Sequence, residues 1–276
     1  MVLPYNYLLQ WTEKLLARGQ YYFSLGQMYD AFSKVSENAL NRALMRLAKK
    51  GKVLSIHRGF YLIIAPRFAN MGILPPFMFM DDLMNYLGRK YYFGLLTAAA
   101  LHGSSHHAPQ QFFVIIEHPP MRPTRSRQWE IKYVSKHSFI REHLVQIKME
   151  TGNIFVSSPV LTALDLIRYE KHIGGLNRAV VVLGELAETI KPEDLSGSSI
   201  KSYPISSLQR LGYLLDILEE KELADALFNS MQAQHLSISP NLLRLKTSVR
   251  SVRSNINPAS YRRWRIIPNI HIDVEP

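Results

Sequence analysis

The sequence contains no cysteine in its 276 residues. This excludes a disulfide framework, a thiolate metal site and a thiol nucleophile, and it fits a reducing compartment. The most apolar stretches, Gly72 to Phe79 and Gly94 to Leu101, are too short to span a bilayer. The N-terminus also lacks the basic start and continuous apolar run of a signal peptide. We therefore expect a soluble cytoplasmic protein that does not associate with membranes.

Motifs that bind phosphate or carry catalysis are missing as well. The sequence has no P-loop, no GxSxG turn and no HExxH helix, and the Gly174-Gly175 pair is typical of a turn between helices. We therefore predict no catalytic residue and no cofactor. An enzyme that modifies nucleic acid or protein remains the alternative. Its site would be assembled from scattered side chains such as Asp165, Arg168, Arg210 and the histidines.

Histidines are the side chains whose spacing superficially resembles a metal site. His102 and His106 stand four apart, with His107 next and His118 beyond the following predicted strand. Gly103 breaks the predicted helix between the first two, and no acidic residue lies at ligand spacing nearby. We therefore predict no metal site.

Positive charge is abundant and gathers at the two ends of the chain. The formal net charge is +11. Residues 1–67 hold ten Lys/Arg against three Asp/Glu, and residues 241–276 hold seven against two, whereas residues 68–240 hold sixteen against seventeen. Localised positive charge of this kind is typical of nucleic-acid binding. The length and the hydrophobic fraction of 47% predict more than one compact unit.

The first 68 residues show the pattern of a winged helix-turn-helix DNA-binding domain. Apolar periodicity predicts three helices, and Ser36 is a favourable N-cap for the third. Two runs of β-branched and aromatic residues, separated by the turn His57-Arg58-Gly59, predict a hairpin after them. The predicted elements are helices at residues 6–18, 25–32 and 36–50 and strands at residues 53–56 and 60–63. Three helices followed by a hairpin is the winged-helix order.

The rest of the chain predicts a second domain of mixed α/β composition. Residues 69–78 contain Gly72, Pro75 and Pro76 and predict a linker, which places the second domain at residues 79–276. Strands come early and helices late, so the fold class of the whole chain is α+β. The predicted elements are helices at 81–88 and 95–102, strands at 111–117, 128–134, 145–148 and 154–156, and helices at 159–169, 176–190, 206–219 and 223–228.

The helix after the turn would enter the major groove of double-stranded DNA. Its inward stripe is Leu40, Leu44 and Leu47, so the opposite face carries the predicted DNA contacts. With the wing, these contacts are Ser36, Asn38, Asn41, Arg42, Met45, Arg46, Lys49, Lys50 and Arg58. Asn can pair with adenine, Arg with guanine and Met with a thymine methyl, whereas the lysines and Arg58 would reach phosphates or the minor groove. The alternative is a merely solvated face of an amphipathic helix.

The basic C-terminal tail allows three interpretations. Arginines interleaved with Tyr261 and Trp264 can form a second nucleic-acid surface, because arginine binds phosphate and aromatic rings stack on bases. The favoured alternative is a closing edge strand whose aromatic side chains point inward and whose arginines face solvent. A third use is docking an acidic surface of a partner. The arginines concerned are Arg250, Arg253, Arg262, Arg263 and Arg265.

Several motifs of the second domain resemble the C-terminal domain of AbiEi-type antitoxins. They occur in that family's order and similar spacing, after a winged helix, and together cover nearly the whole chain. The motifs are YFGLLTAAALHG at 92–103, Ser157-Ser158-Pro159 running into Leu164-Asp165-Leu166-Ile167, Gly174-Gly175-Leu176, and LQRLGYLLD at 208–216. One departure is Val160-Leu161 before Thr162, where many members carry an acidic-basic pair.

The resemblance implies a function that the residues themselves do not show. It implies an antitoxin of a type IV toxin–antitoxin or abortive-infection system, whose winged helix represses its own operon at inverted repeats in the promoter. It also implies a cognate nucleotidyltransferase toxin as the partner that the C-terminal domain neutralises.

Overall fold

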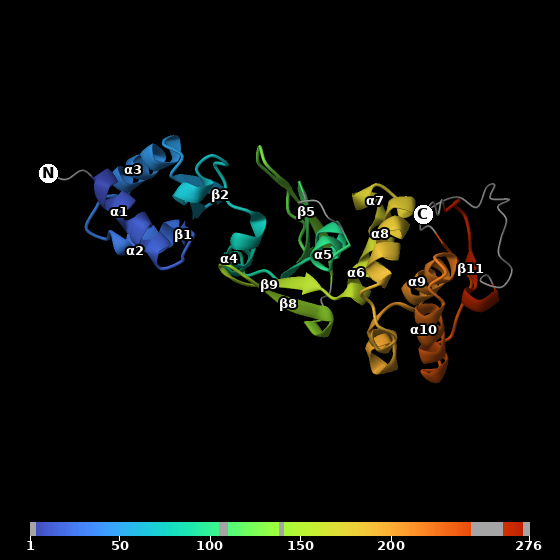
Figure 1. Cartoon of the computed structure of the whole chain (residues 1–276). Coiled ribbons are helices and arrows are strands. Elements are labelled where there is room, and N and C mark those ends of the chain that lie inside the picture. The colour runs from blue at the N-terminus through green and yellow to red at the C-terminus, as the bar shows by residue number, and fades with distance from the viewer. Residues whose placement is uncertain (1–3, 105–109, 138–140, 244–261, 273–276) are drawn as a thin grey trace. The chain divides into compact units, whose positions relative to one another are not determined.

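The computed structural model describes residues 4–104, 110–137, 141–243 and 262–272. The chain divides into two compact units. Unit 1 consists of Met1–Tyr92, Gln110–Phe139 and Gln146–Phe155, and unit 2 of Phe93–Pro109, Ile140–Val145 and Val156–Pro276. Helices and strands are mixed in the chain, as the α+β class requires (Figure 1).

Unit 1 begins with a helix, a strand, two helices and two strands. Ten buried side chains from these elements, including Leu8, Phe23, Leu40 and Val53, form a common core. The elements are α1 (Pro4–Ala17), β1 (Tyr22–Ser24), α2 (Leu25–Ala31), α3 (Glu37–Lys49), β2 (Val53–His57) and β3 (Phe60–Ile63). The predicted helices and hairpin thus have counterparts, whereas β1 is additional and pairs antiparallel with β3, which gives the sheet order β1-β3-β2.

The segment predicted as a linker is packed into unit 1. It follows one short helical turn, η1 (Pro66–Phe68), and ends with another, η2 (Pro76–Met78). Ile73 and Leu74 are buried, and the carbonyl of Leu74 accepts a 3.1 Å hydrogen bond from the indole of Trp129. Unit 1 therefore continues through residues 69–78.

Six strands form one sheet, in which they are hydrogen-bonded in the order β6-β7-β5-β4-β9-β8. Its strands are β4 (Tyr91–Phe93), β5 (Gln111–Glu117), β6 (Thr124–Arg125), β7 (Glu130–Lys136), β8 (Leu144–Met149) and β9 (Gly152–Ser157). β5 and β7 are parallel neighbours. Their register pairs Gln111 with Glu130 at one end and Glu117 with Lys136 at the other. Phe112 to Ile116 are all buried, which explains the continuous apolar run of β5.

Helix α4 (Met80–Tyr86) contacts the N-terminal hairpin within unit 1. The ring of Tyr86 lies 5.4 Å from that of Phe60, and Phe60 stacks on Tyr22 at 5.0 Å. The Tyr22 hydroxyl also hydrogen-bonds the carboxylate of Asp82, which is more than half buried. Burial, helped by the neighbouring charge of Asp81, raises the pKa of Asp82 to about 6.

Replacing Asp82 with asparagine is expected to stabilise unit 1 at neutral pH. The pKa of Asp82 is raised on folding, so its contribution favours the folded state at low pH and is lost as the pH rises from about 4 to about 6. Two pKa units set a ceiling of about 3 kcal/mol, and partial exposure reduces the expected gain to about 1 kcal/mol at pH 7. Urea unfolding at pH 4.5 and pH 7 measures this gain.

Asp30→Asn, at an exposed position on α2, is the control for this substitution because it removes the same charge. In the Asp82→Asn chain, the introduced amide would keep an oxygen that accepts from the Tyr22 hydroxyl. An Asp82→Asn chain whose stability at pH 7 matched that of the wild type would contradict the raised pKa of Asp82.

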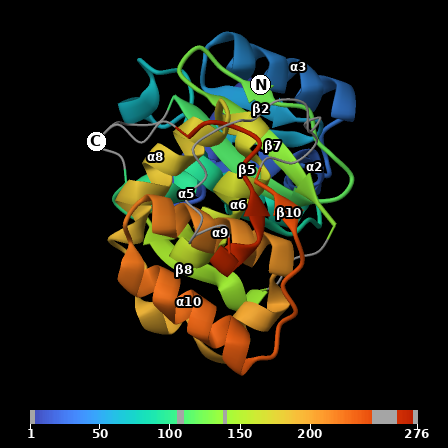
Figure 2. The same ribbon diagram turned by 90° about the vertical axis from the view of Figure 1, so that its right-hand side faces the viewer.

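Unit 2 is mainly helical. Its helices are α5 (Leu95–Leu101), α6 (Pro159–Arg168), α7 (Glu170–Ile173), α8 (Leu176–Ala187), α9 (Ile205–Ile217) and α10 (Lys221–Ala233), with short turns η3 (Arg141–His143), η4 (Pro192–Leu195) and η5 (Gly197–Ser202). Figure 2 shows α9 and α10 beside each other. α10 extends beyond the predicted 223–228 because Leu227 and Met231 continue its buried stripe.

The described residues of the C-terminal segment contribute a short strand, β11 (Ile266–Ile267), to unit 2. It pairs in parallel with β10 (Asn241–Leu242) in a two-stranded sheet. Trp264 is fully buried, but it lies in a helical turn rather than in a strand.

Candidate nucleic-acid interface

Helix α3 presents a continuous exposed face. The residues predicted to contact DNA that are exposed are Ser36, Asn38, Arg42, Met45, Arg46, Lys49, Lys50 and Arg58. The side chain of Met45 is 71% exposed, although it is apolar. The opposite face, Leu40, Ala43, Leu44 and Leu47, is buried in the core. The outward face of α3 therefore carries polar and cationic side chains, with one apolar side chain among them.

Most cations of this face carry no internal counter-charge. Among the described residues, Arg42, Arg46, Lys49 and Arg58 form no ion pair. The ammonium of Lys50 lies 4.6 Å from the centre of the Tyr5 ring on α1. Free surface cations bind phosphate at the cost of displacing only water and counterions.

Asn41 differs from its neighbours because it is half-buried and already bonded. The Tyr29 hydroxyl on α2 donates to its side-chain oxygen at 3.0 Å. This bond fixes the orientation of the amide, and a second lone pair of the oxygen stays available. Sequence reasoning missed Tyr29 because the two residues are twelve apart on different helices.

Helix α3 packs on α1 and β2, and α2 has its own cap and aromatic contacts. Ser24 and Gln27 form a reciprocal capping box at the start of α2. Trp11 of α1 packs edge-on against both Phe23 and Phe32. Ser36, which we predicted as the N-cap of α3, precedes the helix but makes no capping hydrogen bond through its side chain. The side-chain cap in this region is therefore at Ser24.

The turn of the β2–β3 hairpin is held by α4. Gly59 has a φ of +79°, and the Tyr86 hydroxyl donates to the carbonyl of Arg58 at 3.3 Å. The side chain of Arg58 remains exposed. This contact joins residues 28 apart in the chain, so no local sequence signal indicates it.

A second basic segment in unit 1 was missed by the sequence analysis. The arginine arm, residues 118–129, joins β5 to β7 and carries exposed Arg122, Arg125 and Arg127. Arg125 pairs with Glu130 at 2.6 Å, whereas Arg122 and Arg127 form no ion pair with the described residues. Unit 1 holds 18 Lys/Arg against 8 Asp/Glu, and unit 2 holds 15 against 14. The excess positive charge therefore belongs to unit 1 as a whole.

Side chains in the described part of the basic tail make contacts within unit 2. Arg263 forms ion pairs with Asp216 at 3.2 Å and Asp225 at 2.6 Å, and the Trp264 indole donates to Asp216 at 2.7 Å. Arg262 and Arg265 are exposed, and Arg265 donates to the carbonyl of Ile238. Arg250, Arg253 and Tyr261 lie outside the described residues. The predicted inward aromatic is thus present at position 264, with Arg263 paired rather than free.

The side chains considered for catalysis have structural partners. Arg210 is buried and donates to the carbonyls of Ser206, Leu242 and Leu243, and burial lowers its pKa. Asp165 is also buried, whereas Arg168 is exposed. The guanidinium of Arg210 thus links α9 to β10 through hydrogen bonds, which gives this buried arginine a structural role.

The histidines are spread over different contacts. His102 lies 2.7 Å from the carbonyl of Ser157, and His118 stacks on His137 at 5.2 Å. His106 and His107 lie outside the described residues. Within the described ranges, no group of three or more His, Asp or Glu side chains is placed to hold a metal ion. No helix in those ranges is long and apolar enough to cross a membrane.

The chain is similar to a solved structure over most of its length and to a family model over residues 92–217. The chain is similar to the solved structure of the RV2827C protein from Mycobacterium tuberculosis, with 14% sequence identity and a TM-score of 0.61. The similarity covers 93% of this chain and 89% of that one, and it shows a shared fold. No curated protein matches the chain. Residues 92–217 match the model of the AbiEi antitoxin C-terminal domain.

Proposed function

We propose that the protein is an antitoxin that also represses its own operon. Residues 1–68 act as a winged helix-turn-helix that binds inverted repeats in the promoter, and the C-terminal domain neutralises a nucleotidyltransferase-type toxin. The observation that carries the DNA-binding half is the exposed face of α3, whose cations Arg42 and Arg46 have no ion-pair partner among the described residues. The antitoxin half is supported by the family match at residues 92–217.

The α3 face supports a division of labour on DNA. Asn38 and Arg42, in the N-terminal half of the helix, would read base edges, and Met45 would contact a thymine methyl. Tyr29 orients Asn41 for the same purpose. Arg46, Lys49 and Lys50 near the C-terminal end would contact phosphates, which supply affinity without sequence choice.

Replacing Arg42 and Arg46 together with alanine is expected to weaken binding to the DNA upstream of the gene. A bidentate arginine–guanine pair made by Arg42 is worth at least about 1 kcal/mol, and the substitution of Arg46 removes a phosphate contact as well, so the double substitution should raise Kd by about tenfold or more. Fluorescence anisotropy with labelled upstream DNA measures the loss. The same variant should still restore growth when co-expressed with an adjacent nucleotidyltransferase gene, because the substitutions spare the C-terminal domain.

The matched control is Lys14→Ala with Arg18→Ala, which removes two exposed cations from α1 and the turn after it in the same unit. A loss of affinity in the control equal to that in the α3 variant would show that net charge, and not the α3 face, binds the DNA.

A further inference from the structure

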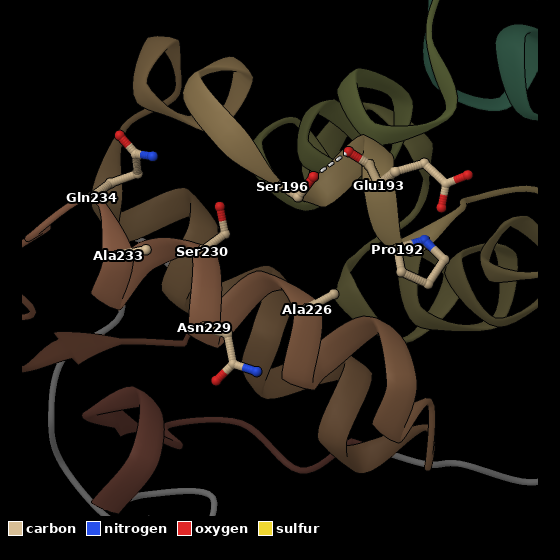
Figure 3. A pocket seen from close by; sticks show the side chains of 8 residues that line it. All are labelled: Pro192, Glu193, Ser196, Ala226, Asn229, Ser230, Ala233 and Gln234. Atoms are coloured by element: carbon tan, nitrogen blue, oxygen red, sulfur yellow. Dashed lines mark hydrogen bonds between the residues drawn. The ribbon is translucent and has the colours of Figure 1, made fainter.

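A groove in unit 2 lies outside everything proposed above. It runs between η4 and α10 and has a volume of about 540 Å³, within the range of sites that bind ligands. Its lining residues are Pro192, Glu193, Ser196, Ala226, Asn229, Ser230, Ala233 and Gln234 (Figure 3).

The groove exists because α10 presents small side chains toward η4. Ala226, Ser230 and Ala233 follow one another at helical spacing and leave the space beside Pro192 unfilled. The opposite wall is held in shape by its own hydrogen bonds. The carboxylate of Asp194 accepts from the backbone of Lys191 at 3.0 Å, and the Ser196 hydroxyl donates to the carbonyl of Glu193 at 2.8 Å.

Ser230 supplies the observation that points to a ligand. The residue is 7% exposed, and its hydroxyl has no hydrogen-bond partner among the described residues. A buried hydroxyl without a partner is costly, and a ligand atom that bonds it recovers that cost. In Figure 3 the Ser230 side chain points from α10 toward the segment that carries Ser196. The groove thus combines apolar walls with one buried hydrogen-bonding group.

The surrounding charge selects the class of ligand. Residues 185–234 carry nine Asp/Glu against four Lys/Arg, in a chain whose net charge is +11. Asp216 and Asp225 share the single guanidinium of Arg263, whereas Glu193 lies exposed in the groove lining itself. The charged residue of the lining is thus a carboxylate, which attracts a cationic side chain.

We propose that the groove binds a lysine or arginine side chain from a basic segment of a partner protein. The aliphatic part of that side chain would pack along Pro192, Ala226 and Ala233, as long cationic side chains commonly do on apolar surfaces. Its charged end would donate to the Ser230 hydroxyl, with the carboxylate of Glu193 supplying the opposite charge. The inference rests on the proposed function only in that an antitoxin has a protein partner.

The probe for this site is a fluorescein-labelled nine-residue peptide of alternating alanine and arginine, titrated with the full chain and followed by anisotropy. The wild type should bind it at least about tenfold more tightly than the corresponding alanine–glutamine peptide. Ser230→Leu fills the groove and should weaken binding about tenfold. Ser230→Ala, which removes only the hydroxyl and leaves packing unchanged, should weaken it about fivefold.

Two matched variants separate the groove from general effects. Gln232→Leu is the control for Ser230→Leu, because it adds a leucine on the exposed face of the same helix. Glu222→Gln is the control for Glu193→Gln, because it removes a carboxylate of α10 outside the groove. Unchanged binding in Ser230→Leu and Ser230→Ala, or equal losses in Glu193→Gln and Glu222→Gln, would overturn the proposal. Binding of upstream DNA by the Ser230 variants tests the proposed function separately, and each result stands if the other fails.

Discussion

Gly212→Ala is expected to destabilise unit 2 by about 2 kcal/mol. Gly212 lies in the middle of α9, and a Cβ atom there would overlap the six-membered ring of the Trp264 indole. Forcing extra volume into a packed core costs up to about 3 kcal/mol, and the better helix propensity of alanine returns about 1 kcal/mol. The clash therefore outweighs the gain in propensity.

The indole cannot move aside without losing other interactions. Trp264 is fully buried, packs edge-on against Phe228 at 5.4 Å and donates to Asp216. Its carbonyl accepts a 2.8 Å hydrogen bond from Gln209, one turn before Gly212 on α9. A displaced ring would break the contact with Asp216, which also pairs with Arg263.

Urea unfolding followed by circular dichroism measures the effect, with Gly184→Ala as the control. Gly184 lies inside α8, where a new Cβ would meet Leu218 at an ordinary 3.6 Å. That substitution should be neutral or slightly stabilising. Trp264→Ala alone should cost about 3–5 kcal/mol, and adding Gly212→Ala to it should cost nothing further. Equal effects of the two glycine substitutions would contradict the close approach.

The tail shows why sequence patterns describe local structure better than long-range packing. Arginines alternating with aromatic residues predict a strand. The Trp264 ring is buried where it is because Gly212, 52 residues earlier, has no side chain and leaves room for it. A glycine inside a helix indicates only that some other part of the chain approaches closely. The partner is an indole ring from the C-terminal segment, and no periodicity indicates it.

The same distinction applies to the candidate interface. The exposed face of α3 follows from the 3.6-residue period of its leucines, so its outward residues were predictable. The contacts of Tyr29 with Asn41 and of Tyr86 with the hairpin join residues far apart in the sequence, so they could not be predicted from it. The short strands β1 and β4, three residues each, exist because they pair with distant strands and have no pattern of their own.

The arginine arm was overlooked for a different reason. Counting charge over residues 68–240 combines the arm with the acidic segment 185–234, and the two cancel. The fold separates them, because the arm belongs to unit 1 and the acidic segment to unit 2. Charge is therefore informative here only when it is counted per compact unit.

Raising the salt concentration from 50 to 200 mM is expected to weaken binding to upstream DNA by about a thousandfold. Arg46, Lys49, Lys50 and Arg58, with Arg122 and Arg127 of the arm, make six cations available to phosphates in unit 1. Each phosphate contact contributes about −0.9 to the slope of log K against log salt, so six predict a slope of about −5. Anisotropy titrations at four or more salt concentrations give this slope.

The arm makes its own contribution to that slope. Arg122→Gln with Arg127→Gln should make the slope shallower by about 2 and leave sequence preference unchanged, because phosphate contacts carry no base information. Arg125 is left in place because it pairs with Glu130. The control, Lys171→Gln with Arg178→Gln, removes two exposed cations from unit 2 and should leave the slope as it is. If both pairs changed the slope equally, the arginine arm would have no special role in binding phosphates.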